Sequence, residues 1–497
     1  MKHSYFDEAA AGDDLHRRSL RGGAISMIGQ GGNVTLQIIS TVVLARILLP
    51  EDFGLVAMVT AVTGYASILV DLGTRDAVAQ RGRVSEGEVS ALFWITFAIG
   101  LTFTAITFLG APLVARFYEE PRLKYIAMVM AITFAVPALY FQQYALMRRA
   151  LMFRKLALID LVSNFLATVV AIGLAYRNYG YWALVWKPVL TAVFTGFGVW
   201  LTCGWWPKRP QFTSGVRELL GFGLNVTGFT VADYIAKSVD RVALGYTAGP
   251  KEVGYYQNAF TVYDNALNVT AAALHNVATA TLSKMRADVP ALQRAWSMAL
   301  SSLTYFVAPA FAILAVIGQD LVVLLLGAKW QTAGAILSIL ALRGPAHVVE
   351  RTHGWLHIAA GRPERWRHWG ILSCILTIAA LFCGLPFGAI GVASAYTILM
   401  YCTFIPALVY AGKPLGIGVR AILQAVGPPV VTALGVAGVG FILRYTLLQD
   451  VLPLVRLLTL GVVCSALYLA TMTFAFRMTK PLSLAASLVR ARKSGTK

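Results

Sequence analysis

Long apolar segments alternate with short polar ones along most of the chain. Each apolar segment can cross ~30 Å of hydrocarbon as a helix, because a helix rises about 1.5 Å per residue. The breaks contain turn residues, such as Leu-Pro-Glu-Asp-Phe-Gly at 49–54 and Ala-Gly-Pro-Lys-Glu-Val-Gly at 248–254. We predict fourteen membrane-spanning helices, over residues 24–47, 54–73, 89–111, 123–146, 156–176, 181–202, 218–245, 255–282, 295–317, 331–358, 368–385, 388–410, 420–445 and 454–476.

The composition supports this prediction and excludes soluble classes of protein. The chain has 497 residues, of which 58% are hydrophobic and 13% charged, and its mean hydropathy is +0.67. Soluble proteins have about 25% charged residues, so a water-exposed surface could not be built from this sequence. A cytosolic enzyme, a disordered chain and a secreted disulfide scaffold are therefore excluded. We expect an all-α polytopic membrane protein.

No cofactor is indicated by the cysteines, the histidines or any nucleotide-binding motif. The five cysteines are scattered among apolar residues without a C-x-x-C motif. His353 and His357 lie four residues apart on one predicted helix, but no third metal ligand accompanies them. No Walker motif occurs, so ATP is not expected to be the direct energy source. We therefore expect neither a cofactor nor a bound metal.

The basic residues predict how the chain is oriented in the membrane. Lys and Arg number 42 against 23 Asp and Glu, a net charge of +19, but no soluble basic domain is present, which excludes nucleic-acid binding. With the N-terminus in the cytoplasm, 28 of the 42 fall in cytoplasmic segments and 9 in external ones. This asymmetry follows the positive-inside rule and predicts that both termini are cytoplasmic. The other five lie deep inside predicted spans, away from the span ends: Lys187, Lys237, Arg241, Arg343 and Arg351.

A short repeat suggests two similar lobes. Pro50-Glu51-Asp52-Phe53-Gly54 matches Pro250-Lys251-Glu252-Val253-Gly254, and each motif precedes a predicted helix. Transporters often place the substrate between such repeats. We predict a cytoplasmic N-terminal tail at 1–23, an N-lobe of helices 1–6 at 24–202, a cytoplasmic linker at 203–217, a C-lobe of helices 7–12 at 218–410, helices 13–14 at 411–476 and a basic cytoplasmic tail at 477–497.

Polar residues recur at helical spacing inside four of the spans. A charge in hydrocarbon costs about 2.5–3.5 kcal/mol on insertion scales, so each should face a partner or water. These residues either line a hydrated cavity or join helices through pairs, such as Asp233 with Lys237 or Glu350 with Arg343 or His347. The four sets are Gln30, Asn33 and Gln37; Asp233, Lys237, Asp240 and Arg241; Asn265 and Asn268; and Arg343, His347, Glu350 and Arg351.

Four stretches of the chain resemble one known family. They are Gln143–Ala157 (QYALMRRALMFRKLA), Asn178–Val185 (NYGYWALV), Arg46–Leu55 (RILLPEDFGL) and Leu69–Gly73 (LVDLG). Together they are similar to WzxC-like lipopolysaccharide and polysaccharide exporters, flippases of the MOP (MATE-like) superfamily, and the resemblance covers roughly residues 20–475.

The resemblance implies two six-helix lobes in a V shape, two added C-terminal helices and transport by alternating access. It also implies that an undecaprenyl-pyrophosphate-linked oligosaccharide is flipped across the bacterial inner membrane for the export of O-antigen, capsule or exopolysaccharide. The lipid bilayer and the lipid-linked oligosaccharide are then the partners, together with a polymerase and glycosyltransferases of the same pathway. A transporter of this kind is not an enzyme.

The polar residues inside the spans fit such a substrate. Basic side chains suit a pyrophosphate, and carboxamides and aromatic faces suit sugars. We expect pyrophosphate contacts first at Lys237, Arg241 and Arg343 and second at Lys187 and Arg351. Sugar contacts are expected at Gln30, Asn33, Gln37, Asn265 and Asn268, with aromatic faces from Tyr65, Tyr234, Tyr263 and Trp355. Ion coupling is expected at Asp233, Asp240, Glu350 or His347.

Two other functions stay open at this point. A MATE-like, proton- or sodium-coupled exporter of drugs or cations would have an anionic cavity, whereas the deep residues hold one more cation than acid. A sugar polymerase or ligase of the outer leaflet would need a large external loop with catalytic residues, and the external loops predicted here are short.

Overall fold

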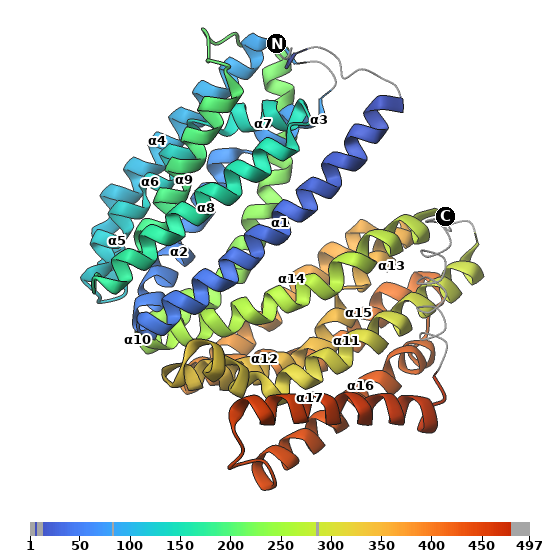
Figure 1. The fold of residues 1–497 in the computed structure, drawn as a ribbon. Coiled ribbons are helices and arrows are strands. Elements are labelled where there is room, and N and C mark those ends of the chain that lie inside the picture. The colour runs from blue at the N-terminus through green and yellow to red at the C-terminus, as the bar shows by residue number, and fades with distance from the viewer. Residues whose placement is uncertain (1–4, 7–12, 82–83, 285–287, 479–497) are drawn as a thin grey trace. The chain divides into compact units, whose positions relative to one another are not determined.

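The computed structural model describes residues 5–6, 13–81, 84–284 and 288–478. These residues form helices, with short 3₁₀ and π turns and no strand (Figure 1). The predicted all-helical fold is therefore confirmed. Contacts divide the chain into unit 1, Met1–Gly254, and unit 2, Tyr255–Lys497, which are taken separately below. The lobe limits and the V shape predicted from the sequence stay predictions, and most of the two tails lies outside the described residues.

The described residues of unit 1 form nine complete helices and the first part of a tenth. Pro50 starts α2, where its missing N–H costs nothing, and Ser85 caps α4 by accepting a hydrogen bond from the Glu88 amide at 3.2 Å. The helices are α1 (Asp13–Ile47), α2 (Pro50–Asp71), α3 (Thr74–Gln80), α4 (Glu86–Phe117), α5 (Arg122–Met130), α6 (Ile132–Ala138), α7 (Phe141–Arg149), α8 (Phe153–Tyr176), α9 (Trp182–Cys203) and α10 (Ser214–Lys284).

The span predicted over 123–146 is not one continuous helix in the structure. Helices α5, α6 and α7 cover this region in three pieces, and the chain bends by 41° between Arg122–Ala138 and Phe141–Arg149. Pro137 lies just before the bend. Because proline has no amide hydrogen and clashes with the preceding turn, it favours a break at this point.

Helix α10 is bent at the turn that the sequence predicts. Gly249 has φ 80° and ψ 178°, which is not helical, and Pro250 follows it. The residues before this bend pack along α2. A Cβ on Gly73 would lie 3.0 Å from the Cα of Gly223, and the Tyr234 hydroxyl donates to the Thr60 carbonyl at 2.6 Å. Glycines therefore allow the two backbones to approach closely.

Unit 2 is built around α11, which packs against α12, α16 and α17. Tyr305 and Tyr468 are both 1% exposed where α11 meets α17, and the Tyr468 hydroxyl donates to the Tyr305 carbonyl at 2.9 Å. The helices are α11 (Val289–Leu326), η1 (Ala328–Trp330), α12 (Gln331–Glu350), α13 (His353–Ala360), α14 (Pro363–Gly384), η2 (Leu385–Phe387), α15 (Gly388–Gly412), η3 (Lys413–Leu415), α16 (Val419–Thr446), α17 (Pro453–Ala470) and the π turn η4 (Thr471–Ala475).

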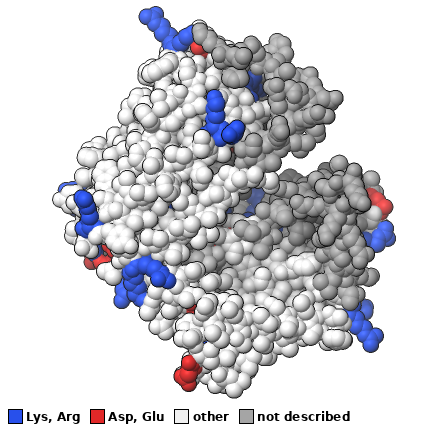
Figure 2. Space-filling model, viewed as in Figure 1, with Lys and Arg blue, Asp and Glu red and all other residues white. Residues whose placement is uncertain are grey.

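Ten helical stretches of the described chain are long and apolar enough to cross a membrane, or eleven if the bent α5–α7 region counts as one. The stretch Glu364–Leu415 has 52 residues and covers α14 from its second residue and all of α15. Helix α10 is not among these stretches. The described surface in Figure 2 is largely uncharged, as expected for a protein that faces lipid. The chain is a multi-pass membrane protein, and the count of fourteen spans stays a prediction.

Candidate functional site

A polar pocket lies within unit 1 where α1, α3, α7 and α8 meet. Its volume is about 360 Å³. Helix α2 ends beside it, and Leu72 (φ 48°) and Gly73 (φ 62°) form a tight left-handed turn that starts α3. The pocket is lined by Gly29, Gln30, Asn33, Asp71, Arg75, Asp76, Tyr144, Arg148, Phe153, Leu156, Ala157 and Asp160.

Small residues bring α1 and α8 together at the wall of this pocket. The two helices pack along each other (Figure 1). A Cβ on Gly29 would lie 2.6 Å from the Cβ of Ala157, so a larger residue would force the helices apart. One turn on, the Asn164 amide donates to the Asn33 side-chain oxygen at 3.3 Å. Asn33 of the predicted polar face therefore contacts α8, and Gln30 and Asn33 both line the pocket.

Ionic and hydrogen-bonded pairs hold the charged side chains of the pocket. Arg75 lies 2.9 Å from Asp71, and its guanidinium is 4.4 Å above the ring of Phe141. Arg148 lies 2.9 Å from Asp76. The Tyr144 hydroxyl donates to Asp160 at 2.8 Å. The pocket thus contains carboxylates, guanidiniums, carboxamides and a phenol, and most of the charged groups are held in place by these pairs.

Sequence reasoning missed most of this pocket. Arg75 and Arg148 are two of the 28 basic residues that the sequence assigns to cytoplasmic segments, yet both line the pocket with Gln30 and Asn33. Asp160 was not singled out at all. A signal was present, because Asp71 and Arg148 lie within two of the family-like stretches.

A second polar cluster lies in unit 2 around Arg343 of α12. Its guanidinium lies 5.3 Å from the ring centre of Tyr263 and 6.0 Å from that of Tyr396. Arg343 Nη2 lies 3.3 Å from His347 Nδ1, and the Tyr263 hydroxyl lies 2.7 Å from the same nitrogen. Arg343 Nε is buried and has no hydrogen-bond partner among the described residues. Arg343 and His347, which the sequence places on one helix face, do lie together.

Glu350, His353 and His357 of α12 and α13 each lie beside a neighbouring side chain. His353 Nδ1 lies 3.3 Å from Glu350 Oε1. His357 is 1% exposed, and its ring is stacked on Trp366 with centroids 6.2 Å apart. Within the described part of the chain, no group of three or more His, Cys, Asp or Glu side chains could hold a metal ion.

The other predicted contact residues are spread over both units. In unit 1, Lys187 donates a hydrogen bond to the Ser40 hydroxyl at 2.6 Å. Arg241 lies beside the buried Asp240, with Nε 3.9 Å from Oδ1, and Gln37 and Lys237 are exposed.

In unit 2, Asn265 is exposed. Arg351 donates a hydrogen bond to Asn268 at 3.4 Å, and the Asn268 side chain donates one to Asp264 at 2.9 Å. The side chain of Asp233 lies outside the described residues.

Two aromatic expectations are wrong. Tyr263 is 0% and Trp355 is 4% exposed, so neither presents an open ring face to a sugar. Tyr263 instead packs against Phe311 of α11, with ring centroids 5.7 Å apart, because its ring completes the unit 2 core beside Arg343.

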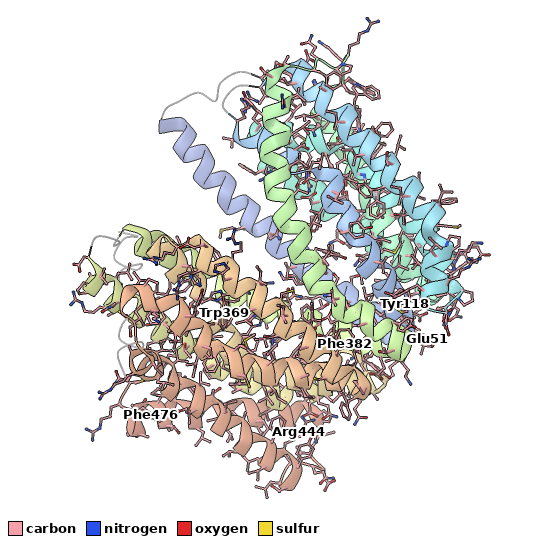
Figure 3. All side chains as sticks on the ribbon, turned by 180° about the vertical axis from the view of Figure 1, so that it is seen from behind. Glu51, Tyr118, Trp369, Phe382, Arg444 and Phe476 are labelled. Atoms are coloured by element: carbon pink, nitrogen blue, oxygen red, sulfur yellow. The ribbon has the colours of Figure 1, made fainter. Side chains whose placement is uncertain are left out.

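One buried ion cluster was also missed. Arg444 and Arg456, which the sequence counts among the nine external basic residues at the outer ends of predicted spans, contact Asp320 at 3.2 and 2.6 Å. Asp320 and Arg444 are each 5% exposed. Arg444 lies in the last turn of α16 (Figure 3). These three residues join α11, α16 and the start of α17.

The chain is similar in sequence to known proteins of polysaccharide biosynthesis. The chain is 25% identical over 317 residues to the succinoglycan biosynthesis transport protein ExoT of Rhizobium meliloti (strain 1021), covering 64% of each chain. It is 24% identical over 415 residues to the lipopolysaccharide biosynthesis protein WzxC of Escherichia coli (strain K12), covering 81% of this chain and 82% of WzxC.

Among solved structures, the lipid II flippase MurJ in an inward closed conformation has a similar fold. The TM-score is 0.67 at 13% identity, over 91% of this chain and 99% of MurJ. The model of one protein family matches residues 43–335, more than half of the chain. The resemblance seen in the sequence is thereby confirmed: this chain belongs to the polysaccharide biosynthesis protein family.

Proposed function

We propose that this protein is a transporter that flips an undecaprenyl-pyrophosphate-linked oligosaccharide from the inner to the outer leaflet of a bacterial inner membrane. It works by alternating access and serves the export of a surface polysaccharide. The names of two relatives, a succinoglycan transport protein and a lipopolysaccharide biosynthesis protein, support this substrate class. The MurJ-like fold supports the same kind of membrane machinery.

The observation that carries the proposal is Arg343. Its guanidinium is enclosed by aromatic rings inside unit 2, and its Nε has no hydrogen-bond partner among the described residues. Keeping an ionised guanidinium in a membrane-spanning helix is costly unless an anion or water compensates it. A pyrophosphate provides oxygens that accept hydrogen bonds from a guanidinium with strong charge assistance. Arg343 is therefore our first candidate for contact with the head group.

The other predicted residues keep their proposed roles. Lys237 and Arg241 are also proposed as head-group contacts, and Lys187 and Arg351 are second candidates. Gln37, Asn265 and Asn268 are proposed sugar contacts, like Gln30 and Asn33. Asp233, Asp240, Glu350 and His347 are proposed for ion coupling. Both termini are proposed to be cytoplasmic, and a polymerase and glycosyltransferases of the pathway are proposed partners.

An export assay tests the proposal. In a host that lacks its own flippase, the wild-type protein should restore export of the polysaccharide. Arg343→Gln should reduce export by about tenfold or more, because losing a charge-assisted hydrogen bond costs about 1.5–3 kcal/mol. Arg343→Lys should restore part of the export, and Arg420→Gln, at an exposed arginine of α16, should leave it unchanged.

Protein levels in the membrane are measured for every variant. Wild-type export by Arg343→Gln at a normal level would remove Arg343 from the proposed site. Failure of the wild-type protein to restore any export, together with resistance to cationic dyes in a pump-deficient host, would instead favour a drug exporter of similar fold.

A further inference from the structure

The polar pocket of unit 1 has a chemistry different from that of the Arg343 cluster. We infer that this pocket is a saccharide subsite, which holds hydroxyl-bearing sugar and not the pyrophosphate. This inference rests on the proposed function, and it assigns one part of the substrate to one set of residues. Asp160, Tyr144 and Arg75 become substrate contacts that the sequence did not indicate.

Charge excludes the pyrophosphate from this pocket. Three carboxylates, of Asp71, Asp76 and Asp160, accompany two guanidiniums, so the described residues of the lining have a formal charge of −1. Both arginines already have a carboxylate at 2.9 Å. A second anion would have to replace these partners and would be repelled by Asp160. The pocket therefore favours a ligand that is neutral overall.

Hydrogen-bonding capacity favours sugar hydroxyls. A hydroxyl both donates and accepts, so it can donate to a carboxylate and accept from a guanidinium or a carboxamide at once. Asp160 provides the first kind of partner, and Arg75, Gln30 and Asn33 provide the second. A ligand with several hydroxyls can use this mixture, whereas a cationic drug could use only the carboxylates.

The size and walls of the pocket also fit a sugar ring. Its volume of about 360 Å³ lies in the range of about 300–1,000 Å³ typical of small-molecule sites. Phe153 and Tyr144 add aromatic rings to the lining, and the apolar face of a pyranose packs well on such rings.

The pocket is braced before any ligand arrives. Tyr144 of α7 is tied to Asp160 of α8 by the 2.8 Å hydrogen bond, and Arg75 is fixed between Asp71 and the ring of Phe141. Side chains that are already ordered lose little entropy on binding, so a weakly interacting sugar can still be recognised.

A binding experiment with two lipids tests the inference. The full-length protein in nanodiscs is titrated with the lipid-linked repeat unit isolated from the cells that produce it, and separately with undecaprenyl pyrophosphate without sugar. Asp160→Asn and Asn33→Ala should each raise the Kd for the glycosylated lipid by about tenfold or more. The Kd for the lipid without sugar should stay the same. Asp450→Asn, at an exposed residue of unit 2, is the control.

The other outcomes would refute either the saccharide subsite alone or the proposed function as well. An equal rise of Kd for both lipids, or no rise for either, would refute the saccharide subsite while leaving the proposed function in place. If the wild-type protein binds neither lipid, the proposed function fails and the subsite fails with it. Normal melting temperatures of the two pocket variants show that a loss of binding is not a loss of fold.

Discussion

Gly54 of α2 and Gly254 of α10 lie against each other in unit 1, each beside the carbonyl of the other motif's proline. A Cβ on Gly54 would overlap the carbonyl oxygen of Pro250, and a Cβ on Gly254 would overlap that of Pro50. The same Cβ atoms would lie 3.0 Å from the Gly254 amide nitrogen and 3.1 Å from the Gly54 amide nitrogen. The two five-residue motifs that match in the sequence thus form a reciprocal contact in space.

We predict that this contact tolerates no side chain. Gly54→Ala and Gly254→Ala should each lower the melting temperature of the purified protein in detergent, because the atoms they would strike belong to the backbone and cannot rotate away. Overpacking of this kind costs about 1–3 kcal/mol. Gly173→Ala in α8 is the matched control, since a Cβ there meets nothing within 4 Å. Equal melting temperatures for Gly54→Ala and Gly173→Ala would refute the close approach.

The ion cluster of unit 2 should be essential for stability. Asp320→Asn removes the only carboxylate that the described residues bring to Arg444 and Arg456, and both guanidiniums then stay buried without their counter-ion. Breaking a buried ion pair in this way costs about 3–5 kcal/mol.

The comparison for this prediction is Asp76→Asn in unit 1. The Asp76–Arg148 pair has the same kind of contact, but its side chains are 48% and 42% exposed. Exposed pairs contribute about 0–1 kcal/mol, so thermal unfolding should change little. A smaller loss for Asp320→Asn than for Asp76→Asn would contradict the assigned burial.

Stability near Glu120 should depend on pH. Glu120, in the loop between α4 and α5, accepts hydrogen bonds from Nε and Nη2 of Arg122, both at 2.8 Å. The side-chain hydrogen bond from Arg122 holds the pKa of Glu120 below its ordinary value. Arg122 also contacts Glu51, which lies at the same end of unit 1 as Tyr118 (Figure 3).

The direction in which stability changes with pH follows from this lowered pKa. The folded protein holds the Glu120 proton less tightly than the unfolded chain, so the contribution to stability is present above the ordinary pKa of about 4.3. It is lost as the pH falls through the lowered pKa. Glu120→Gln should therefore melt earlier than the wild type at pH 7, and the difference should shrink towards pH 3. A difference that stays constant with pH, or one that Glu119→Gln reproduces, would argue against the Arg122 interaction.

Much of the fold could be predicted from the sequence, because hydrophobic runs and turn residues act locally. Helices such as α8 and α9 begin and end within a few residues of the predicted spans, and the bend of α10 lies at the predicted Gly-Pro turn. The breaks in α5–α7 were missed, because a proline inside an apolar run can be accommodated or can bend the chain, and packing decides which.

The candidate site was less predictable, because the same residue type serves different purposes at different places. Arg75 and Arg148 look like ordinary cytoplasmic charges until the turn at Leu72–Gly73 folds α3 towards α7. Arg444 looks like an external charge at the end of a span until Asp320, more than a hundred positions earlier, is found beside it. Such pairings depend on tertiary contacts, which helical periodicity does not contain.

The measurement that tests the central claim most directly is flipping by the purified protein in liposomes. The lipid-linked repeat unit is incorporated with the protein, and a glycosidase added outside reports how much sugar reaches the outer leaflet. We predict that wild-type protein raises the accessible sugar well above that of protein-free liposomes and that Arg343→Gln raises it far less. Accessible sugar equal to that of protein-free liposomes, with correctly folded protein present, would contradict the account.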